Sequence, residues 1–380
     1  MLKRFSGFES NFLSFSVIAA GLSLAAATTT AFATVPTGSV DLLPITKKIP
    51  IQGGPDWIGI GFGSTWVKTG STVLRINSTI ADATLNTVVA TIPAATCRGF
   101  AEGFGRMWSL ECGTQKIIGI DPMTNTVVDS IPVVTGGGGE GSIAAGENGI
   151  WVVSGTDSSK LTRIDPATHA IVTDQIQMTA NSNGVVAAFG YVWVSNSSAG
   201  TVSQIDPATN TVTHVIAVGM GPRFIAAGEG AVWTINQGDG SVSRIAQPVA
   251  GMPVGADAPI VLGVYAGGGD IKVGEGGVWV TVGGTPLIRI DPTTLKISHI
   301  FTGSTGDALN VGFGSVWLPA YGAQGSEIWR IDAAATTQVV FPTPGPPAAP
   351  AGVPVAPVGV PPLVVAPMTP VAPTTPVTNP

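Results

Sequence analysis

The sequence is poor in charge and in reactive side chains. Only 11% of its 380 residues are charged, the formal net charge is −6, and it has three histidines and two cysteines. Because no basic stripe is present, the electrostatic footprint of a nucleic-acid-binding protein is missing, and we expect no nucleic-acid partner. The chain also lacks a G-x-S-x-G nucleophile motif, a phosphate-binding loop and a Cys–His nucleophile pattern, so no sequence motif indicates catalysis.

Glycine and proline, by contrast, are abundant. The 51 glycines and 30 prolines exceed ordinary usage, which indicates many tight turns or low-complexity segments. Turn signals fill the middle of the chain, whereas proline dominates its C-terminal end. With 44% hydrophobic residues, the chain can also bury a large core.

The N-terminal residues have the features of an export signal. Lys3 and Arg4 give a positive start, an apolar stretch runs from Phe12 to Ala27, and Ala31-Phe32-Ala33 forms a small-residue cleavage site. We therefore expect a signal peptide over residues 1–33 and a secreted or periplasmic, cell-envelope protein. An uncleaved membrane anchor is the alternative, although serine and glycine interrupt this short stretch. No later segment has the length of a transmembrane span, so none is expected in the mature chain.

One tryptophan-centred motif recurs along the chain at a spacing of about forty residues. Each copy follows a glycine-rich turn such as GFGSTW or GEGAVW, and the seven tryptophans are Trp66, Trp108, Trp151, Trp193, Trp233, Trp279 and Trp317. A second segment such as LTRIDP comes next, and then a third such as NTVVATI. A glycine-containing loop and a short apolar run such as FIAAG complete the unit.

These segments are typical of β-strands joined by hairpins, because they alternate, are rich in β-branched residues and are separated by turn signals. Four strands in each of seven units predict an all-β fold, a seven-bladed β-propeller of four-stranded blades around a central channel. We count strands outward from the channel: FIAAG is the first, the tryptophan lies on the second, RIDP on the third and NTVV on the fourth. The propeller is expected over residues 45–341, after a linker over residues 34–44.

Ring closure requires one terminus to supply a strand. Ile45 to Ile51 (ITKKIPI) resembles a fourth strand and could complete the seventh blade, but Thr337 to Phe341 competes for that place. The N-terminal strand is slightly favoured, and both alternatives stay open.

The composition changes abruptly after Phe341. Residues 342–380 contain fourteen prolines and no charged residue, which predicts a disordered, polyproline-like tail. This tail is either a plain spacer or a stalk that associates the protein with the cell envelope.

Two residue patterns mark the turns. Asp-Pro pairs lie between the third and fourth strands, where Asp accepts backbone amides and Pro presets φ; they are Asp121-Pro122, Asp165-Pro166, Asp206-Pro207 and Asp291-Pro292. A metal site made of these aspartates is disfavoured because they lie on separate blades. Glu147, Glu229 and Glu275 recur between the first and second strands, where we expect solvated side chains.

The two cysteines flank the first two strands of one blade. Cys97 precedes the first strand of blade 2 and Cys112 follows its second strand, so antiparallel pairing brings both to the same end. Neighbouring strand ends can satisfy the geometry of a disulfide, and we predict a structural Cys97–Cys112 bond. A reactive thiol is the rival interpretation, but no histidine or other activating pattern lies nearby.

A ring of polar residues is expected at the channel mouth. It falls ten positions before each repeat tryptophan, or next to that position, and comprises Asp56, Arg98, Glu140, Asn183, Arg223, Asp270 and Asp307. Converging carboxylates and guanidinium groups could recognise a small polar ligand or a protein partner's loop. Asn196 and Asn236 are expected close by. The alternative is a solvated rim whose charges offset one another.

The three histidines are predicted to point away from this mouth. His169, His214 and His299 fall in or beside fourth strands on three different blades. A histidine-based metal site or acid–base pair needs side chains within a few ångströms of each other, which these positions do not provide.

The unit VWVSN…GTVSQIDPATNTVTHVIAVGMGPRFIAAG closely resembles the YVTN-type propeller repeat, which is similar to that of bacterial and archaeal surface proteins and of streptogramin (virginiamycin B) lyases. The resemblance covers about residues 45 to 341 and is specific for the fold. Resemblance to the lyases would imply elimination on a cyclic peptide lactone, with Mg²⁺ and a histidine base at the mouth. This chain has no histidine in the matching positions.

We therefore expect an exported, non-catalytic propeller that recognises a ligand or protein at its mouth and needs no cofactor. The alternative is a metal-dependent lyase, in which Asp56, Asp270 or Asp307 would hold Mg²⁺ or Ca²⁺.

Overall fold

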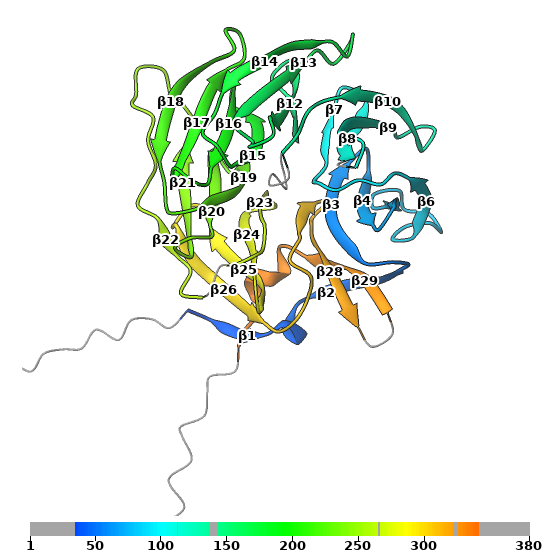
Figure 1. Cartoon of the computed structure of the whole chain (residues 1–380). Helices are drawn as coiled ribbons and strands as arrows, with labels where there is room; N and C mark the ends of the chain where they lie inside the picture. Colours follow the sequence, from blue (N-terminus) through cyan, green and yellow to red (C-terminus); the bar gives the residue numbers. More distant parts are fainter. Residues whose placement is uncertain (1–34, 112, 137–142, 265–266, 323–324, 342–380) are drawn as a thin grey trace, which may run out of the picture. The chain divides into compact units, whose positions relative to one another are not determined.

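The computed structural model describes residues 35–341 apart from 112, 137–142, 265–266 and 323–324. Seven antiparallel sheets follow one another along these residues, which confirms the predicted propeller (Figure 1). Each innermost strand contacts the innermost strand of the next blade, and β27 of the last blade contacts β3 of the first, so the ring is closed. The predicted leader and proline-rich tail lie outside the described residues.

Blades 1 to 4 have four strands each. Blade 1 consists of β3 Pro55–Gly61, β4 Ser64–Thr69, β5 Thr72–Asn77 and β6 Val88–Pro93, and blade 2 of β7 Ala101–Gly103, β8 Arg106–Glu111, β9 Lys116–Asp121 and β10 Thr126–Pro132. Blade 3 consists of β11 Ile143–Gly146, β12 Gly149–Ser154, β13 Lys160–Ile164 and β14 Ile171–Gln177. Blade 4 consists of β15 Ser182–Ala188, β16 Tyr191–Asn196, β17 Thr201–Asp206 and β18 Thr211–Ala217.

Blades 5 to 7 depart more from the repeat. Blade 5 consists of β19 Pro222–Gly228, β20 Ala231–Asn236, β21 Ser241–Ala246 and β22 Ile260–Val261. Blade 6 contains β23 Ile271–Gly274, β24 Gly277–Val282, β25 Thr285–Asp291 and β26 Lys296–Thr302. Blade 7 contains β27 Asn310–Gly312, β28 Ser315–Gly322 and β29 Gly325–Asp332. The outermost strand of blade 5 is thus only two residues long.

The N-terminal strand completes blade 7. β2 (Ile45–Ile51) pairs antiparallel with β29, as in Ile49↔Ile328, so one sheet joins both ends of the ring. The competing segment, Thr337 to Phe341, forms no strand: its first two residues end the 3₁₀ helix η2 (Ala335–Gln338), and the rest has no regular secondary structure.

The residues before β2 have more structure than a linker needs. β1 (Thr37–Ser39) pairs parallel with β26 as a fifth strand of blade 6, and the 3₁₀ helix η1 (Val40–Leu42) follows it. Phe341 packs over this strand, because a Cβ on Gly38 would overlap its ring. No helix among the described residues is long and apolar enough to cross a bilayer.

We call the two ends of the ring the mouth end, where chain crossovers enter the innermost strands, and the turn end. At the turn end every repeat tryptophan is fully buried and donates its indole N–H to the carbonyl five residues earlier, as Trp66 does to Gly61 at 3.0 Å. Five of the seven also lie against an arginine of the third strand; these arginines are Arg75, Arg163, Arg244, Arg289 and Arg330.

Several of these arginines also join neighbouring blades. Arg75 donates to the Asn125 side chain of blade 2 at 2.9 Å, and Arg330 of blade 7 donates to Asn86 of blade 1 at 2.7 Å. Both asparagines have a positive φ, near 60°, which Asn tolerates better than most residues. The arginine of the RIDP-type motif therefore links consecutive blades and spans the junction where the ring closes.

The turn glutamates bond to the neighbouring blade, which the sequence did not indicate, although Glu229 and Glu275 are exposed as expected. Oε1 of Glu229 accepts the N–H of Gly276 in the next blade at 3.0 Å, and Glu147 and Glu275 bond in the same way to Gly190 and Gly314. Each glutamate thus ties its turn to the following one. The aspartates of the Asp-Pro turns accept backbone amides as predicted, for example Asp291 from Thr293 at 2.9 Å.

Candidate ligand-binding site at the channel mouth

Six of the seven residues of the predicted polar ring are described, and all six lie at or just before the start of an innermost strand. Glu140 lies outside the described residues. In blades 1 and 5 a β-bulge interrupts the pairing at this point, between Pro55 and Ile58 and between Pro222 and Ile225. Bulges re-aim side chains, and here they place Asp56-Trp57 and Arg223-Phe224 at the mouth.

Four of the predicted residues line one cavity of about 80 Å³ at the mouth. They come from blades 1, 5, 6 and 7 and are Asp56, Arg223, Asp270 and Asp307. The remaining lining is Trp57, Phe224, Gln237, Gly268, Gly269 and Ala308. The structure therefore brings together residues that are far apart in the sequence, as the propeller topology predicted.

Two of the three carboxylates in this cavity have a lysine partner. Asp56 lies 2.8 Å from the Lys68 ammonium, and the fully buried Asp270 lies 2.6 Å from Lys272. Burial raises the pKa of the Asp270 carboxyl, while the charge of Lys272 acts in the opposite direction. Asp270 also accepts the N–H of Ile271 at 2.7 Å, so its carboxylate already has partners within the protein.

Asp307 differs from the other two carboxylates. Its side chain is exposed and makes no hydrogen bond or ion pair within the part of the chain that is described. Tyr321 lies near it and donates its hydroxyl to the carbonyl of Pro55. Burial raises the pKa of the Tyr321 hydroxyl, and the charges of Asp56 and Asp307 raise it further.

An aromatic pair separates the mouth from the channel. The rings of Trp57 and Phe224 meet edge to face, with centroids 5.5 Å apart, although they come from blades 1 and 5. Both residues also line a second cavity of about 310 Å³, which residues of all seven innermost strands surround. This second cavity is the central channel, and the aromatic pair lies between it and the mouth cavity.

Other residues predicted for the mouth are occupied elsewhere. Arg98 is buried and donates to the carbonyl of Gly136, and Asn183 donates to Ser197 at 2.6 Å. Asn196 and Asn236 are fully buried and donate to serines of their own blades. None of the four lines the mouth cavity. Their polar groups stabilise the loops and strands behind it.

Sequence reasoning missed the aromatic residues and the two lysines. Trp57 and Phe224 directly follow ring positions, whereas the equivalent residues of blades 2 and 4 are Gly99 and Gly184. Comparing the residue that follows each ring position would therefore have shown that only blades 1 and 5 have an aromatic side chain at this point. Lys68 and Lys272 could have been noticed as charges within otherwise apolar strands.

Of the two cysteines predicted to form a disulfide, Cys97 is described by the structure. The N–H of Cys97 donates to the carbonyl of Leu110 at 2.9 Å, which puts Cys97 beside the end of β8. Cys112 lies outside the described residues, so the disulfide stays a prediction.

The histidines lie where the sequence indicated. His214 and His299 are on the outermost strands β18 and β26, and His169 precedes β14. Among the described residues, no group of three or more His, Cys, Asp or Glu side chains could hold a metal ion.

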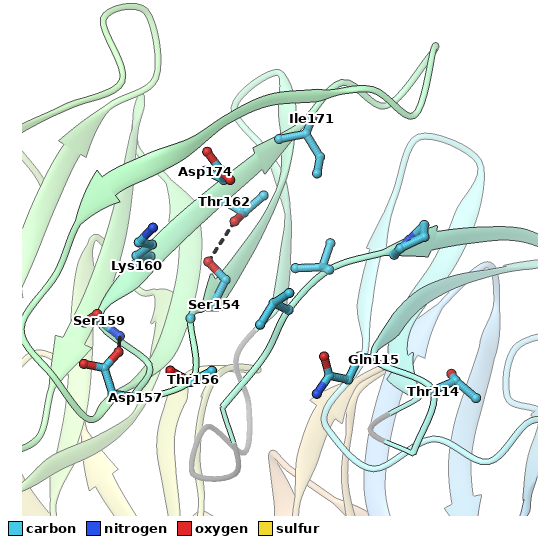
Figure 2. A pocket seen from close by; sticks show the side chains of 14 residues that line it. Thr114, Gln115, Ser154, Thr156, Asp157, Ser159, Lys160, Thr162, Ile171 and Asp174 are labelled. Atoms are coloured by element: carbon cyan, nitrogen blue, oxygen red, sulfur yellow. Dashed lines mark hydrogen bonds between the residues drawn. The ribbon is translucent and has the colours of Figure 1, made fainter.

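A larger cavity of about 610 Å³ lies between blades 2 and 3, away from the mouth cavity (Figure 2). Hydroxyl groups dominate one wall, where Ser154 and Thr162 share a hydrogen bond of 2.7 Å. Lys160, Asp157 and Asp174 lie at its edge, and Val133, Val134 and Ile171 supply apolar surface.

Residues 134–249 match a family described as a repeat of unknown function, DUF6923. No curated protein sequence matches the chain. Among solved structures, a streptogramin B lyase is similar with a TM-score of 0.57 and 15% identity, over 75% of this chain and 96% of the lyase. The virginiamycin B lyase of Staphylococcus aureus gives 0.57 and 14%, over 76% and 97%.

The β-propeller domain of Cps50 (Swd1) from Myceliophteria thermophila is similar with a TM-score of 0.61 at 9% identity, over 76% of this chain and 99% of that domain. At such low identities these likenesses concern the fold alone. They confirm the repeat character and the propeller, and the YVTN assignment stays a prediction.

Proposed function

We propose that this protein is an exported, non-catalytic recognition propeller that binds a ligand or a protein partner at its channel mouth. The observation that carries the proposal is the convergence of Asp56, Arg223, Asp270 and Asp307, from four blades, on one cavity. Propeller mouths collect one loop from every blade, and concave sites with a few polar groups are the usual places of recognition. The leader and tail read from the sequence support export.

Nothing in the described residues favours the lyase alternative over binding. The similarity to streptogramin lyases is one of fold, at 15% identity or less. The aspartates of the mouth make lysine pairs or stand alone. Recognition is therefore the function that these side chains support best.

Capture on immobilised protein tests this proposal. The full mature chain would be exposed to culture medium or periplasmic extract beside the double variant Arg223→Gln/Asp307→Asn. A matched control, Asp174→Asn/Lys296→Gln, removes one charge of each sign from outer strands. We expect the mouth variant to lose the partners that the wild type and the control retain. Equal capture by all three proteins would refute a binding role for the mouth.

The Cys97–Cys112 disulfide belongs to the same proposal, because disulfides persist in oxidising compartments. Intact mass after alkylation, with and without reduction, tests it on protein purified from its natural compartment. We expect alkylation of both thiols only after reduction. Alkylation without reduction would show that the thiols are unbonded.

A further inference from the structure

The mouth cavity combines three features that suit one class of ligand: an aromatic wall, a carboxylate without a partner among the described residues, and a small volume. We propose that it binds an alkylammonium group, such as a lysine side chain or a methylated amine, between the Asp307 carboxylate and the Trp57 ring. This inference rests on the proposed function and names the chemistry that the mouth would recognise.

The aromatic wall consists of Trp57 and Phe224, which meet edge to face. Indole offers the best face for a cation among the protein side chains, because its π-system has a negative quadrupole. The molecule already uses this surface for a cation of its own, since the Arg223 guanidinium carbon lies 5.5 Å from the centre of the Phe224 ring. No side-chain cation of the described residues lies against Trp57, whereas Arg244 lies against Trp233 deep in blade 5.

The charges of the cavity favour a cation near Asp307. Lys68 and Lys272 neutralise Asp56 and Asp270 at 2.8 and 2.6 Å, which leaves Asp307 as the carboxylate without a partner in the described structure. Asp56 and Asp307 both act on Tyr321, so their potentials overlap there. Arg223 also lines the cavity, so a cation is favoured on the Asp307 side rather than over the cavity as a whole.

The cavity also restricts the size of the ligand. With about 80 Å³ it accepts an ammonium head with its attached methyl or methylene groups, but not a large ring system. Gly268 and Gly269 form part of the wall, and a Cβ on Gly269 would overlap the backbone of Thr281, so only glycine fits there. Backbone rather than side chains thus bounds the cavity on that side.

Titration with choline and with butylammonium, each followed by NMR, tests the inference. The neutral isostere of choline, 3,3-dimethylbutan-1-ol, has the same shape without the charge. We expect the isostere to bind about tenfold or more weakly than choline, which is a difference of about 1.4 kcal/mol. Comparing the two amines tells whether the site prefers a quaternary or a primary ammonium group.

Asp307→Asn is the decisive variant, because the exposed side chain contributes little to folding. It should weaken the binding of both amines about tenfold and leave the isostere unchanged. Trp57→Leu should weaken amine binding, whereas Trp57→Phe, which keeps a ring, should retain most of it. Asp174→Asn, on a distant outer strand, should have no effect.

The inference is overturned if choline and its isostere bind equally, if Asp307→Asn binds amines as well as the wild type does, or if neither amine binds. In each of these cases the mouth could still capture a partner through other chemistry. Loss of capture in Arg223→Gln/Asp307→Asn without amine binding would therefore refute the inference and keep the proposed function. Equal capture would refute the binding of captured partners at the mouth, and the amine titration alone would then decide the inference.

Discussion

The two ends of the ring follow different rules. At the turn end the same contacts recur among the described residues: every blade has a buried tryptophan bonded to a carbonyl, five blades have an arginine against its ring, and three of these arginines bond to an asparagine of the next blade. At the mouth end the equivalent position varies in charge and type, with aspartate in three blades, arginine in two, and glutamate and asparagine in one each. We infer that the repeated contacts set stability, whereas the varied positions are available for recognition.

Two blades lack the arginine against the tryptophan, blade 2 with Gly119 and blade 4 with Gln204, and the junction between blades 2 and 3 shows what can replace its link. At that junction blade 3 has His169 where Asn125 or Asn210 would stand. Asp129 fills the space, bonding to Arg106 at 2.9 Å and approaching His169 at 3.5 Å. A cavity of about 610 Å³ also lies between these two blades, but its lining comes mostly from the loops after β8 and β12 and from the segment after β10, at the mouth end.

Replacing a repeat tryptophan should have the largest effect on stability. Trp66→Ala removes a fully buried indole and its bond to Gly61, and should lower the free energy of unfolding by about 3–5 kcal/mol. Urea denaturation measures the change. Trp329→Ala is the control, because Trp329 is outside the repeat and only half-buried; an equal loss there would contradict a special role for the repeat position.

Breaking the link that closes the ring should have a smaller effect. A double-mutant cycle of Arg330→Ala and Asn86→Gly isolates their bond of 2.7 Å, and glycine keeps the positive φ of residue 86 available. We expect a coupling of about 1–3 kcal/mol, as for hydrogen bonds to charged groups. Additive effects of the two substitutions would mean that this bond does not hold blades 7 and 1 together.

The Asp-Pro turns should make the turn end sensitive to acid. The backbone amides of Thr294 and Thr293 hold the pKa of the Asp291 carboxyl below its usual value. A pKa lowered by folding gives stability that is present above the unfolded value, about 3.9, and is lost as the pH falls through the folded value. Asp291→Asn accepts the same bonds but does not titrate, so its unfolding midpoint should depend less on pH below about 4. Identical pH profiles would contradict this assignment.

Substitution at the mouth should have the smallest effect on stability. Asp307→Asn changes an exposed side chain without a partner among the described residues, so the free energy of unfolding should stay within about 0.5 kcal/mol of the wild type. Thermal or urea unfolding measures it. A loss comparable to that of Arg330→Ala would mean that the mouth, too, serves mainly to hold the ring together.

The sequence predicted the regular half of this molecule well and the irregular half less well. The spacing of Trp66 and its equivalents identified seven blades, because a packing contact that every blade makes requires the same residue at regular intervals in the sequence. The cavity could be foreseen only as a ring of seven candidates, of which Arg98 and Asn183 bond into loops instead. Those bonds depend on loop conformations that periodicity does not encode.

Two contacts that the sequence did not indicate have related causes. The bond of the exposed Glu229 to Gly276 was not foreseen, because Gly276 belongs to the next blade. Trp57 was not noticed because it has no counterpart in most other blades. A contact between two blades cannot be recognised from the sequence of one repeat. An aromatic residue present in only two repeats, such as Trp57, is overlooked when the repeats are compared for what they share.

Paired measurements on the mouth double variant Arg223→Gln/Asp307→Asn test the division between the two ends most directly. The unfolding midpoint and the captured partners would be determined on the same preparation, beside the wild type and Asp174→Asn/Lys296→Gln. We predict loss of the captured partners in a variant that still unfolds cooperatively, with a midpoint lowered much less than that of Trp66→Ala. Retention of those partners at the wild-type level would contradict the claim that the mouth end is the recognition surface of this propeller.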